Sequence, residues 1–435
     1  MKNCDRSCKV MNRRTFLAAG ASAAFAANRP NIVLILADDL GYGDLGCFGG
    51  RQIRTAHLDR LAAQGSRLTA HYVCSPVCSA SRAGLLTGRY PERTGVTGVL
   101  REEHDHSGLS LSETTLAQQL SRAGYETALV GKWHLGMPEA YRPTRRGFQS
   151  FYGFLNGTID YDTHLSTGGG WRGRPTTFRD ETPIREGGYY PDLLTKEAVR
   201  FVRRKHDRPF FLFLSLPLPH TPLQVPAHWS KPYEGGKGNA IYAGMVACMD
   251  DGVGQVLRAL DEQGLRENTA VVFFSDNGST KNNPRSMLIG SNEPFGGGKY
   301  ELREGGLRSP CIVRWPGVTR PGSVIDTPLS SLDWFPTLAA PNAAVDGENI
   351  QPVLRGGRPR RERSFFWAFR DDLVKTPQSY ACRRGHWKYM DVAGKEMLYD
   401  LRNDPGETKD LAARRPEVTK SLSAELRAWR SSVGG

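Results

Sequence analysis

The chain has 435 residues, with 58 Lys and Arg against 45 Asp and Glu, which gives a formal net charge of +13 at pH 7. Hydrophobic residues make up 39% of the chain and charged residues 24%, a balance that excludes a disordered tail, a collagen-like fibre and a multispan membrane protein. The excess of positive charge suggests an anionic partner, such as nucleic acid, membrane lipid or an acidic substrate.

The N-terminal segment has the pattern of an export signal. Arg13 and Arg14 precede a short apolar stretch at residues 16–27, and the pair resembles the twin-arginine signal of bacteria. The alternative is a short helix or anchor, but the stretch is too short to span a bilayer and poor in large apolar side chains. We therefore expect residues 1–27 to be a signal peptide with an upstream extension. The rest is expected to be exported, to the bacterial periplasm or the extracellular space, without stable membrane insertion.

Four short apolar runs share one pattern, in which β-branched or aromatic residues are followed at once by polar ones. The runs lie at residues 32–36, 127–130, 210–216 and 270–274. Strands that are buried on both faces of a parallel sheet have this composition. Helical periodicity is found at residues 58–64, 112–123, 192–204 and 241–263. The chain is therefore predicted to form an α/β domain with a mostly parallel sheet sandwiched by helices.

Polar side chains stand at the carboxyl end of each predicted strand. In open α/β sheets, ligands bind at these ends. The residues concerned are Asp38, Asp39, Lys132, His134, His220, Asp276 and Asn277. We expect them to converge on one site although they lie far apart in the sequence. Two long segments with weak periodicity, residues 138–190 and 281–298, are predicted to be loops that rim this site.

The pattern changes to shorter segments at about residue 363. Residues 364–369, 380–383, 387–390 and 397–401 are predicted to form a small antiparallel sheet. An amphipathic helix follows, and its apolar face is formed by Val418, Leu422, Leu426 and Trp429. We expect a catalytic domain at residues 28–362 and a C-terminal subdomain at residues 363–435.

The most specific motif of the chain begins at Cys78. The segment reads Cys78-Ser79-Ala80-Ser81-Arg82-Ala83-Gly84-Leu85-Leu86-Thr87-Gly88. It resembles the signature of the type I sulfatase family, Cys-x-Pro-Ser-Arg-x-x-x-Leu-Thr-Gly, with Ala80 in the proline position. Cys74 is a competing start, but it puts Cys78 rather than an arginine four positions on. The resemblance implies that a formylglycine-generating maturation enzyme oxidises Cys78 to Cα-formylglycine, whose hydrated aldehyde is the nucleophile.

Elementary chemistry agrees with this interpretation of the Cys78 segment. A nucleophile at the start of a helix faces the positive end of the helix dipole and unpaired N–H groups, which favour an anion. Arg82, one turn further on, can orient the nucleophile with its rigid fork of donors. The alternative is a buried structural cysteine at a helix start, and the length of the motif argues against it.

A metal site is predicted at two of the strand ends. Asp38 and Asp39 follow one strand, and Asp276 and Asn277 follow another. One such pair alone is more often a solvated turn or a helix cap, but two pairs at equivalent strand ends favour a metal. Oxygen ligands without Cys or His suit calcium or magnesium rather than zinc. The resemblance to sulfatases implies calcium, bound by these four residues and touching the modified Cys78.

Basic residues complete the expected site. Lys132, His134, His220 and Lys299 lie in segments similar to other sulfatase motifs, and the resemblance covers nearly all of the chain beyond the signal. It implies an alkaline-phosphatase-like fold in which Lys132, His220 and Lys299 bind the sulfate. We hypothesise that His220 or Lys299 donates a proton to the departing alcohol. His134 then removes a proton from the second hydroxyl of the hydrate, which expels sulfate.

The resemblance thus implies a sulfuric ester hydrolase of the arylsulfatase and N-acetylgalactosamine-6-sulfatase kind, acting on a sulfated carbohydrate or an aryl sulfate. Residues 152–161, with Arg172, Arg174 and Arg179, resemble the variable wall of glycan-acting sulfatases. A hexose or N-acetylhexosamine sulfate at a chain end is the expected substrate.

Three other functions are alternatives to this one. The alternative enzyme is a phosphodiesterase or phosphonate monoester hydrolase of the same superfamily. A non-catalytic binder of sulfated glycans is disfavoured by the completeness of the set of site residues. No nucleic-acid partner is expected, because the chain has no recognition motif and no interleaving of aromatic and basic residues.

Overall fold

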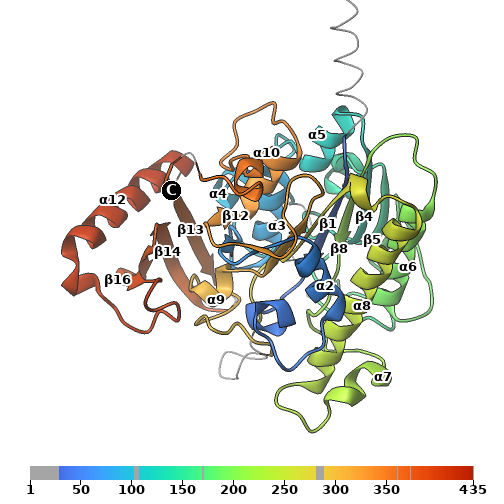
Figure 1. Ribbon diagram of the computed structural model, residues 1–435, viewed down its shortest axis with the longest axis horizontal. Helices are drawn as coiled ribbons and strands as arrows, with labels where there is room; N and C mark the ends of the chain where they lie inside the picture. Colours follow the sequence, from blue (N-terminus) through green and yellow to red (C-terminus); the bar gives the residue numbers. More distant parts are fainter. Residues whose placement is uncertain are drawn as a thin grey trace, which may run out of the picture.

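The structure, a computed structural model, describes residues 29–101, 107–168, 171–280, 289–359, 361–372 and 374–434. The predicted export signal lies outside the described residues. A large α/β sandwich makes up most of the molecule, and a smaller sheet carrying one long helix stands beside it (Figure 1).

The four predicted strands form the middle of the central sheet. They are β9 (Thr269–Ser275), β1 (Asn31–Ala37), β8 (Phe210–Ser215) and β4 (Glu126–Lys132), adjacent in that order. Each neighbouring pair is parallel, and every residue of β1, β8 and β9 is buried. The prediction of a mostly parallel sheet covered on both faces is therefore confirmed.

Shorter strands extend this sheet on both sides. In the described residues the full order is β11-β2-β10-β9-β1-β8-β4-β5-β6-β7. The additional strands are β2 (Ser66–Leu68), β5 (Ser150–Phe154), β6 (Thr177–Arg179), β7 (Thr182–Pro183), β10 (Cys311–Arg314) and β11 (Ser323–Ile325). A separate parallel pair joins β3 (His71–Tyr72) to β12 (Leu329–Ser330).

One prediction about this sheet was wrong. Residues 138–190 were expected to be loop, yet they supply β5, β6 and β7 at one edge of the sheet. These strands have two to five residues each, which is too few for an alternating pattern to be recognised. Part of the segment expected to form a rim is therefore an extension of the sheet itself.

Helices cover the sheet in two layers. Alternate residues of β1 point to opposite faces: Ile32, Leu34 and Leu36 join one hydrophobic cluster, while Val33 and Ile35 join the other. The first cluster includes residues of α3 (Cys78–Thr87), α5 (Leu116–Arg122), α10 (Trp334–Leu338) and α11 (Gln351–Leu354). The second includes residues of α2 (Ala56–Gln64), α6 (Tyr190–Arg203) and α8 (Ala240–Glu262). The short helices are α4 (Pro91–Thr94), α7 (Ala227–Ser230) and α9 (Glu304–Leu307).

The predicted helices are present, with one displaced start. The helix expected from residue 112 begins at Leu116, because the Thr115 side chain accepts a hydrogen bond from the Gln118 amide and caps the helix there. Gln118 in turn accepts from the Thr115 amide, which completes a capping box.

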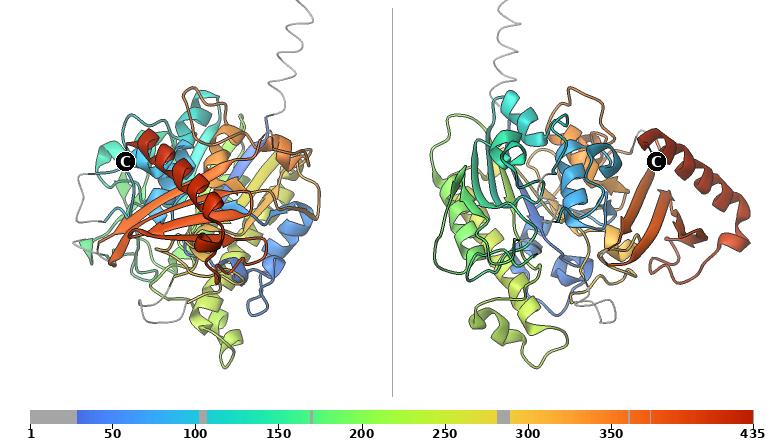
Figure 2. Two further views of the ribbon diagram at one scale, coloured as in Figure 1. Left: turned by 90° about the vertical axis from the view of Figure 1, so that its left-hand side faces the viewer. Right: turned by 180° about the vertical axis from the view of Figure 1, so that it is seen from behind.

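The C-terminal part forms the small antiparallel sheet and helix that the sequence predicts. Its strands are β13 (Ser364–Asp371), β14 (Thr376–Arg384), β15 (Trp387–Val392) and β16 (Lys395–Asp400), paired in chain order. Helix α12 (Pro416–Val433) crosses the outer face of this sheet (Figure 2, left). Leu422, Leu426 and Trp429 are buried there, and Val418 packs against the same cluster. The opposite face of the sheet packs against the α/β sandwich through Trp367 and Ala381.

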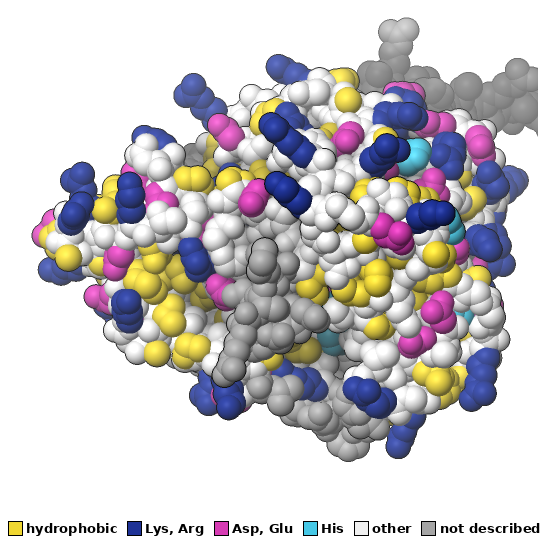
Figure 3. Space-filling model, turned by 90° about the horizontal axis from the view of Figure 1, so that it is seen from below, with side chains coloured by type: hydrophobic (Ala, Val, Ile, Leu, Met, Phe, Trp, Pro, Cys, Tyr) yellow, Lys and Arg dark blue, Asp and Glu magenta, His cyan; other side chains and the backbone are white. Residues whose placement is uncertain are grey.

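The surface carries charges of both signs. On the face shown in Figure 3, Lys and Arg side chains are scattered and interspersed with Asp and Glu. Among the described residues, no helix combines the length and apolar composition needed to cross a membrane.

Candidate active site

The predicted site residues meet at the carboxyl ends of the four central strands. Asp38 and Asp39 follow β1, Lys132 ends β4, and Asp276 follows β9. The residues brought together with them are His134, His220, Asn277 and Lys299 from loops, and Cys78 and Arg82 from α3. The strand-end rule therefore located one cluster from segments that are far apart in the sequence.

Cys78 is the first residue of α3, and only 2% of its surface is exposed. The charges of Lys132 and Lys299 lower the pKa of its thiol, and the carboxylates of Asp38 and Asp276 raise it. Burial nevertheless raises the pKa of this thiol above its ordinary value. An unmodified Cys78 would therefore stay protonated and be a poor nucleophile at neutral pH.

Arg82 lies one turn further along α3 and is almost completely buried. Its Nε and Nη2 donate to Asp276 Oδ2 at 3.0 and 2.7 Å. Its Nη1 donates to Ser215 Oγ at 2.6 Å and to the Lys132 carbonyl at 3.3 Å. All three guanidinium nitrogens are thus used, and the arginine ties α3 to the ends of β4, β8 and β9.

Two lysines pair with the acidic residues after β1. Lys132 Nζ donates to Asp38 Oδ2 at 2.7 Å, and Lys299 Nζ lies 2.8 Å from Asp39 Oδ1 and 2.9 Å from Oδ2. Burial alone would raise the pKa of Asp38, but Lys132 and the other cations around it hold it well below its usual range. Burial would likewise lower the pKa of Lys299, but Asp39 raises it well above its ordinary value. Lys299 therefore carries its positive charge.

The charges of this cluster balance without an ion. The cations are Arg82, Lys132 and Lys299, and the carboxylates are Asp38, Asp39 and Asp276. Burial and the neighbouring Asp38 nevertheless raise the pKa of Asp276 to about 7, so the negative charges crowd one another. A bound divalent cation would relieve this crowding and leave the site with a positive surplus that attracts an anion.

The donor set fits a hard divalent cation. Asp38 Oδ1 and Asn277 Oδ1 are buried oxygens with no hydrogen-bond partner among the described residues. The Asn277 amide nitrogen donates to Asp39 Oδ1 at 2.6 Å, which leaves the Asn277 oxygen available as a ligand. Buried oxygens without a hydrogen bond are costly unless something binds them. Carboxylate and amide oxygens are the ligands that calcium prefers.

His220 lies beside this acidic group, a position that the sequence did not predict as metal-binding. Ligand atoms of Asp38, Asp39 and His220 lie within 4.8 Å of one another, and His220 Nε2 is 3.7 Å from Asp39 Oδ2. His220 Nδ1 lies 2.6 Å from the Thr221 carbonyl. Because a carbonyl only accepts, this nitrogen carries the proton of the neutral ring. Burial, aided by Lys299, lowers the pKa of His220.

His134 is held in a defined orientation. Its Nε2 lies 2.9 Å from the Leu100 carbonyl, so Nε2 carries the ring proton. Nδ1 is buried and has no hydrogen-bond partner among the described residues. Burial first, and then the nearby Lys132, lowers the pKa of His134 well below its ordinary value. The neutral imidazole therefore offers Nδ1 as a proton acceptor.

Three residues at the site that the sequence analysis missed are Ser215, Leu100 and Thr221. Ser215 is the last residue of β8, so the strand-end rule could have found it. Leu100 and Thr221 act through backbone carbonyls, and a sequence pattern of side chains cannot predict such a role.

The segment after β5 packs against both histidines. A Cβ atom on Gly157 would lie 2.7 Å from His134 Cε1, so only glycine allows this contact with the ring. Thr158 Oγ1 donates to the Thr221 carbonyl at 2.8 Å, and Tyr161 Oη contacts the His220 carbonyl at 2.9 Å. Residues 157–161 thus form a wall beside the site.

Two of the three arginines expected in that wall bind other groups. Arg179 Nη1 binds Glu197 of α6 at 3.0 Å, and the Arg174 guanidinium lies 5.2 Å from the ring centre of Trp171. Arg172 is exposed, and no contact joins it to the described site residues.

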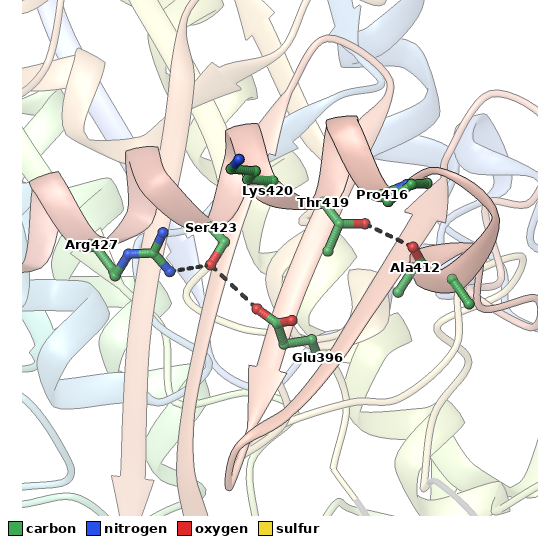
Figure 4. A pocket seen from close by; sticks show the side chains of 8 residues that line it. Glu396, Ala412, Pro416, Thr419, Lys420, Ser423 and Arg427 are labelled. Carbon is green, nitrogen blue, oxygen red and sulfur yellow. Dashed lines mark hydrogen bonds between the residues drawn. The ribbon is translucent and has the colours of Figure 1, made fainter.

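A pocket of about 450 Å³ lies far from this cluster, between α12 and β16. Figure 4 shows that its polar side chains bind one another: Arg427 donates to Ser423, and Ser423 donates to Glu396. None of the predicted site residues lines it.

Comparisons with known proteins agree with the geometry. Residues 30–340 match the protein family described as Sulfatase, and residues 298–432 match the family described as N-sulphoglucosamine sulphohydrolase, C-terminal. Steryl-sulfatase of Mus musculus is 34% identical, over 96% of this chain and 85% of that protein. Arylsulfatase A of Homo sapiens is 35% identical, over 94% and 89%. The solved structure of Ps i-CgsB in complex with k-i-k-neocarrahexaose has a TM-score of 0.84 and 31% identity, and the match covers 92% of this chain and 93% of that one.

Proposed function

Because the chain belongs to the type I sulfatase family of the alkaline-phosphatase-like superfamily and is a sulfuric ester hydrolase, we propose a specific chemistry for it. The enzyme cleaves the sulfate ester of a sulfated carbohydrate with a formylglycine derived from Cys78 and with calcium held beside it. The observation that carries this proposal is the position of Cys78, at the start of α3, among two lysines and an acidic group with free ligand oxygens.

The residues around Cys78 fit both groups. Asp38, Asp39, Asp276 and Asn277 would hold the calcium, which supplies Lewis-acid polarisation, and the hydrated formylglycine supplies a nucleophilic hydroxyl. The high pKa of the buried Cys78 thiol argues against an unmodified cysteine as the nucleophile. A serine or a cysteine in its place could be sulfated but lacks the second hydroxyl through which sulfate is expelled.

The other residues bind charge and move protons. Lys132 and Lys299 neutralise the sulfate oxygens as charge develops on them. Lys299 keeps its proton because of Asp39 and would donate it to the departing alcohol. His220, whose ring proton is directed at the Thr221 carbonyl, would bind the substrate and not protonate it. His134 accepts a proton at Nδ1, since its Nε2 proton is committed to the Leu100 carbonyl. Arg82 orients Asp276 and the start of α3.

A carbohydrate substrate is favoured by the polar wall beside His220. Thr158, Asp160, Thr221 and Gln224 are partly exposed there, and such side chains suit the hydroxyl groups of a sugar ring. The related structure of Ps i-CgsB contains k-i-k-neocarrahexaose, a ligand whose name denotes a chain of sugars. We therefore favour a hexose or N-acetylhexosamine sulfate over an aryl or steryl sulfate.

We also propose that the chain is exported and that its units are those expected from the sequence. Residues 1–27 would serve as the export signal, residues 28–362 as the catalytic domain and residues 363–435 as the C-terminal subdomain. Export to the bacterial periplasm or the extracellular space suits an enzyme that meets sulfated glycans. Comparing the N-terminal sequence of the exported protein with that of the full chain tests the first of these boundaries.

Mass spectrometry of the peptide that contains Cys78 tests the modification. The tryptic peptide 68–82 contains both Cys74 and Cys78, so fragment ions can assign any change to one of them. We expect loss of sulfur and gain of oxygen at Cys78, with Cys74 intact as the internal control. The protein must come from cells that express the maturation enzyme. A fully active enzyme with an unmodified Cys78 would contradict the proposal.

The substrate class is tested separately. A panel of sulfated monosaccharides and oligosaccharides, an aryl sulfate and a steryl sulfate would be compared by release of inorganic sulfate. We expect kcat/KM to be highest for one sulfated sugar. A clear preference for the aryl or steryl sulfate would overturn the assignment to carbohydrates and leave the sulfatase chemistry intact.

A further inference from the structure

The orientation of His134 depends on the backbone carbonyl of one irregular segment. Leu100 lies in a stretch without helix or strand, yet its carbonyl alone fixes which imidazole nitrogen carries the proton. His134 itself has a positive φ of 59°, and Gly157 packs against its ring. The ring is therefore placed from both sides, and a shift of the Leu100 carbonyl would remove its only described acceptor.

Two contacts hold the Leu100 carbonyl in place. On one side, the Leu100 amide donates to Ser79 Oγ at 3.0 Å, and Ser79 is the neighbour of Cys78. On the other side, Arg101 Nη2 donates to both carboxylate oxygens of Asp371 at 2.8 Å. The Leu100 carbonyl and the Arg101 N–H belong to one peptide plane, so this ion pair, which restrains the Arg101 backbone through its side chain, also limits the movement of the carbonyl.

The Asp371 carboxylate is held in a fixed position. It is the last residue of β13, only 4% exposed, and its Oδ1 also accepts from the Val374 amide at 3.2 Å. The Arg101 side chain is 24% exposed, so the pair is screened less than a surface ion pair. If Arg101 were lost, the mostly buried Asp371 carboxylate would lose this ion pair, which is unfavourable.

We propose that Arg101 and Asp371 are positioning residues for His134. The end of β13 holds the Leu100 carbonyl against Nε2, so that the imidazole presents Nδ1 as its proton acceptor. The small C-terminal sheet therefore contributes to the catalytic centre although none of its residues belongs to the site. The consequence for turnover rests on the proposed role of His134, whereas the effect on the imidazole does not.

The imidazole is tested directly by NMR of protein labelled with ¹⁵N at histidine and carrying unmodified Cys78. The chain has ten histidines, and His134→Gln would identify the signals of His134. We expect a single Nε2–H tautomer in the wild type. Asp371→Asn and Arg101→Gln should each give a measurable fraction of the Nδ1–H tautomer, and Arg101→Lys, which keeps a charged donor, should restore most of the wild-type spectrum.

Kinetics on the mature enzyme give the second measurement. A misplacement of about 1 Å in an active site can cost roughly 10²-fold in rate. We therefore expect Asp371→Asn and Arg101→Gln to lower kcat about 10- to 100-fold with little change in KM. The matched control is Asp372→Asn, because the Asp372 side chain is 78% exposed and pairs with Arg370 at the surface. This variant should behave as the wild type in both measurements.

The results of these experiments distinguish the positioning role of Arg101 and Asp371 from the proposed sulfatase chemistry. An unchanged His134 spectrum and an unchanged kcat in Asp371→Asn would overturn the positioning role, as would an equal loss in Asp372→Asn. A shifted tautomer in a protein that releases no sulfate from any ester would support the positioning role and contradict the proposed function. If Asp371→Asn fails to fold, Arg101→Gln on the partly exposed side of the pair decides the question.

Discussion

Arg82 is the residue that connects the nucleophile helix to the sheet. Its guanidinium uses Nε and Nη2 on Asp276 and Nη1 on Ser215. A lysine could carry the same charge, but its single ammonium cannot reproduce a planar fork with donors in three directions. The geometry of this residue, and not only its charge, is therefore required.

We expect Arg82→Lys to lower kcat/KM about 100-fold, as for the loss of one preorganised donor. The same change should destabilise the protein by about 2 kcal/mol, because hydrogen bonds to buried charged groups are lost. Urea denaturation gives the stability. Arg89→Lys is the control, since Arg89 lies just beyond the end of α3 and its side chain is 34% exposed where it pairs with Glu113. Near-wild-type kinetics in Arg82→Lys would show that charge alone is sufficient there.

The role of some single residues in the site can be predicted from the sequence, and that of others cannot. Cys78, Arg82 and Lys132 belong to motifs or strand ends, so their side chains were recognisable and the structure brings them together. Leu100 was not recognisable, because its carbonyl is a group that every residue has. Arg101 and Asp371 are separated by 270 positions, and a pairing at that distance has no local signal.

At the scale of whole elements, burial decided what could be predicted. The central strands are continuous apolar runs because both of their faces are covered by helices. The edge strands β6 and β7 have three and two residues, so their composition is set by neighbouring turns. They form because β5 offers an open edge, a property of the assembled sheet that no single segment encodes.

The proposed metal site would be built from whole elements, because its four ligands follow the ends of β1 and β9. We expect a calcium chelator to lower both activity and the melting temperature, and added calcium to restore both. Binding at 100 times the dissociation constant stabilises a protein by about 2.7 kcal/mol, which corresponds to a shift of a few degrees. Differential scanning fluorimetry measures it without any substrate.

The ligand set is tested with two buried aspartates. Asp276→Asn should abolish the calcium-dependent shift, because it removes a charged ligand. Asp250→Asn should retain it, since Asp250 is also buried but binds the amides of His57 and Leu58 at the start of α2. A normal calcium response in Asp276→Asn would exclude Asp276 from the ligand set.

For the molecule as a whole, an important contact is the one between the C-terminal sheet and helix α9. Lys388 of β15 is fully buried, and its Nζ lies 3.0 Å from Glu304 Oε1 and 2.8 Å from Glu407 Oε1. Arg308 also faces Glu304, at 3.5 Å. Glu304 begins α9, five positions after Lys299. This cluster of charges therefore attaches the C-terminal sheet to the segment that carries a site lysine.

We expect Lys388→Met to destabilise the protein by about 3–5 kcal/mol at neutral pH, because two buried carboxylates would lose their shared cation. Lys395→Met is the control, since Lys395 is an exposed residue of the adjacent strand β16. Urea denaturation of both variants measures the difference. An equal, small effect in the two variants would mean that the buried cluster does not hold the C-terminal sheet against α9.

The loss of stability in Lys388→Met should depend on pH. Burial alone would raise the pKa of Glu304, but Lys388, Arg383 and Arg308 lower it to about 2. In the wild type, the ionised Glu304 therefore stabilises the fold above the unfolded pKa of about 4.3, and this is lost as the pH falls toward 2. Without Lys388, the pKa of Glu304 rises because its strongest cationic neighbour is gone, so less of this stabilisation is present at neutral pH. The deficit of Lys388→Met should therefore be largest near neutral pH and shrink in acid, and a deficit independent of pH would point to lost packing instead.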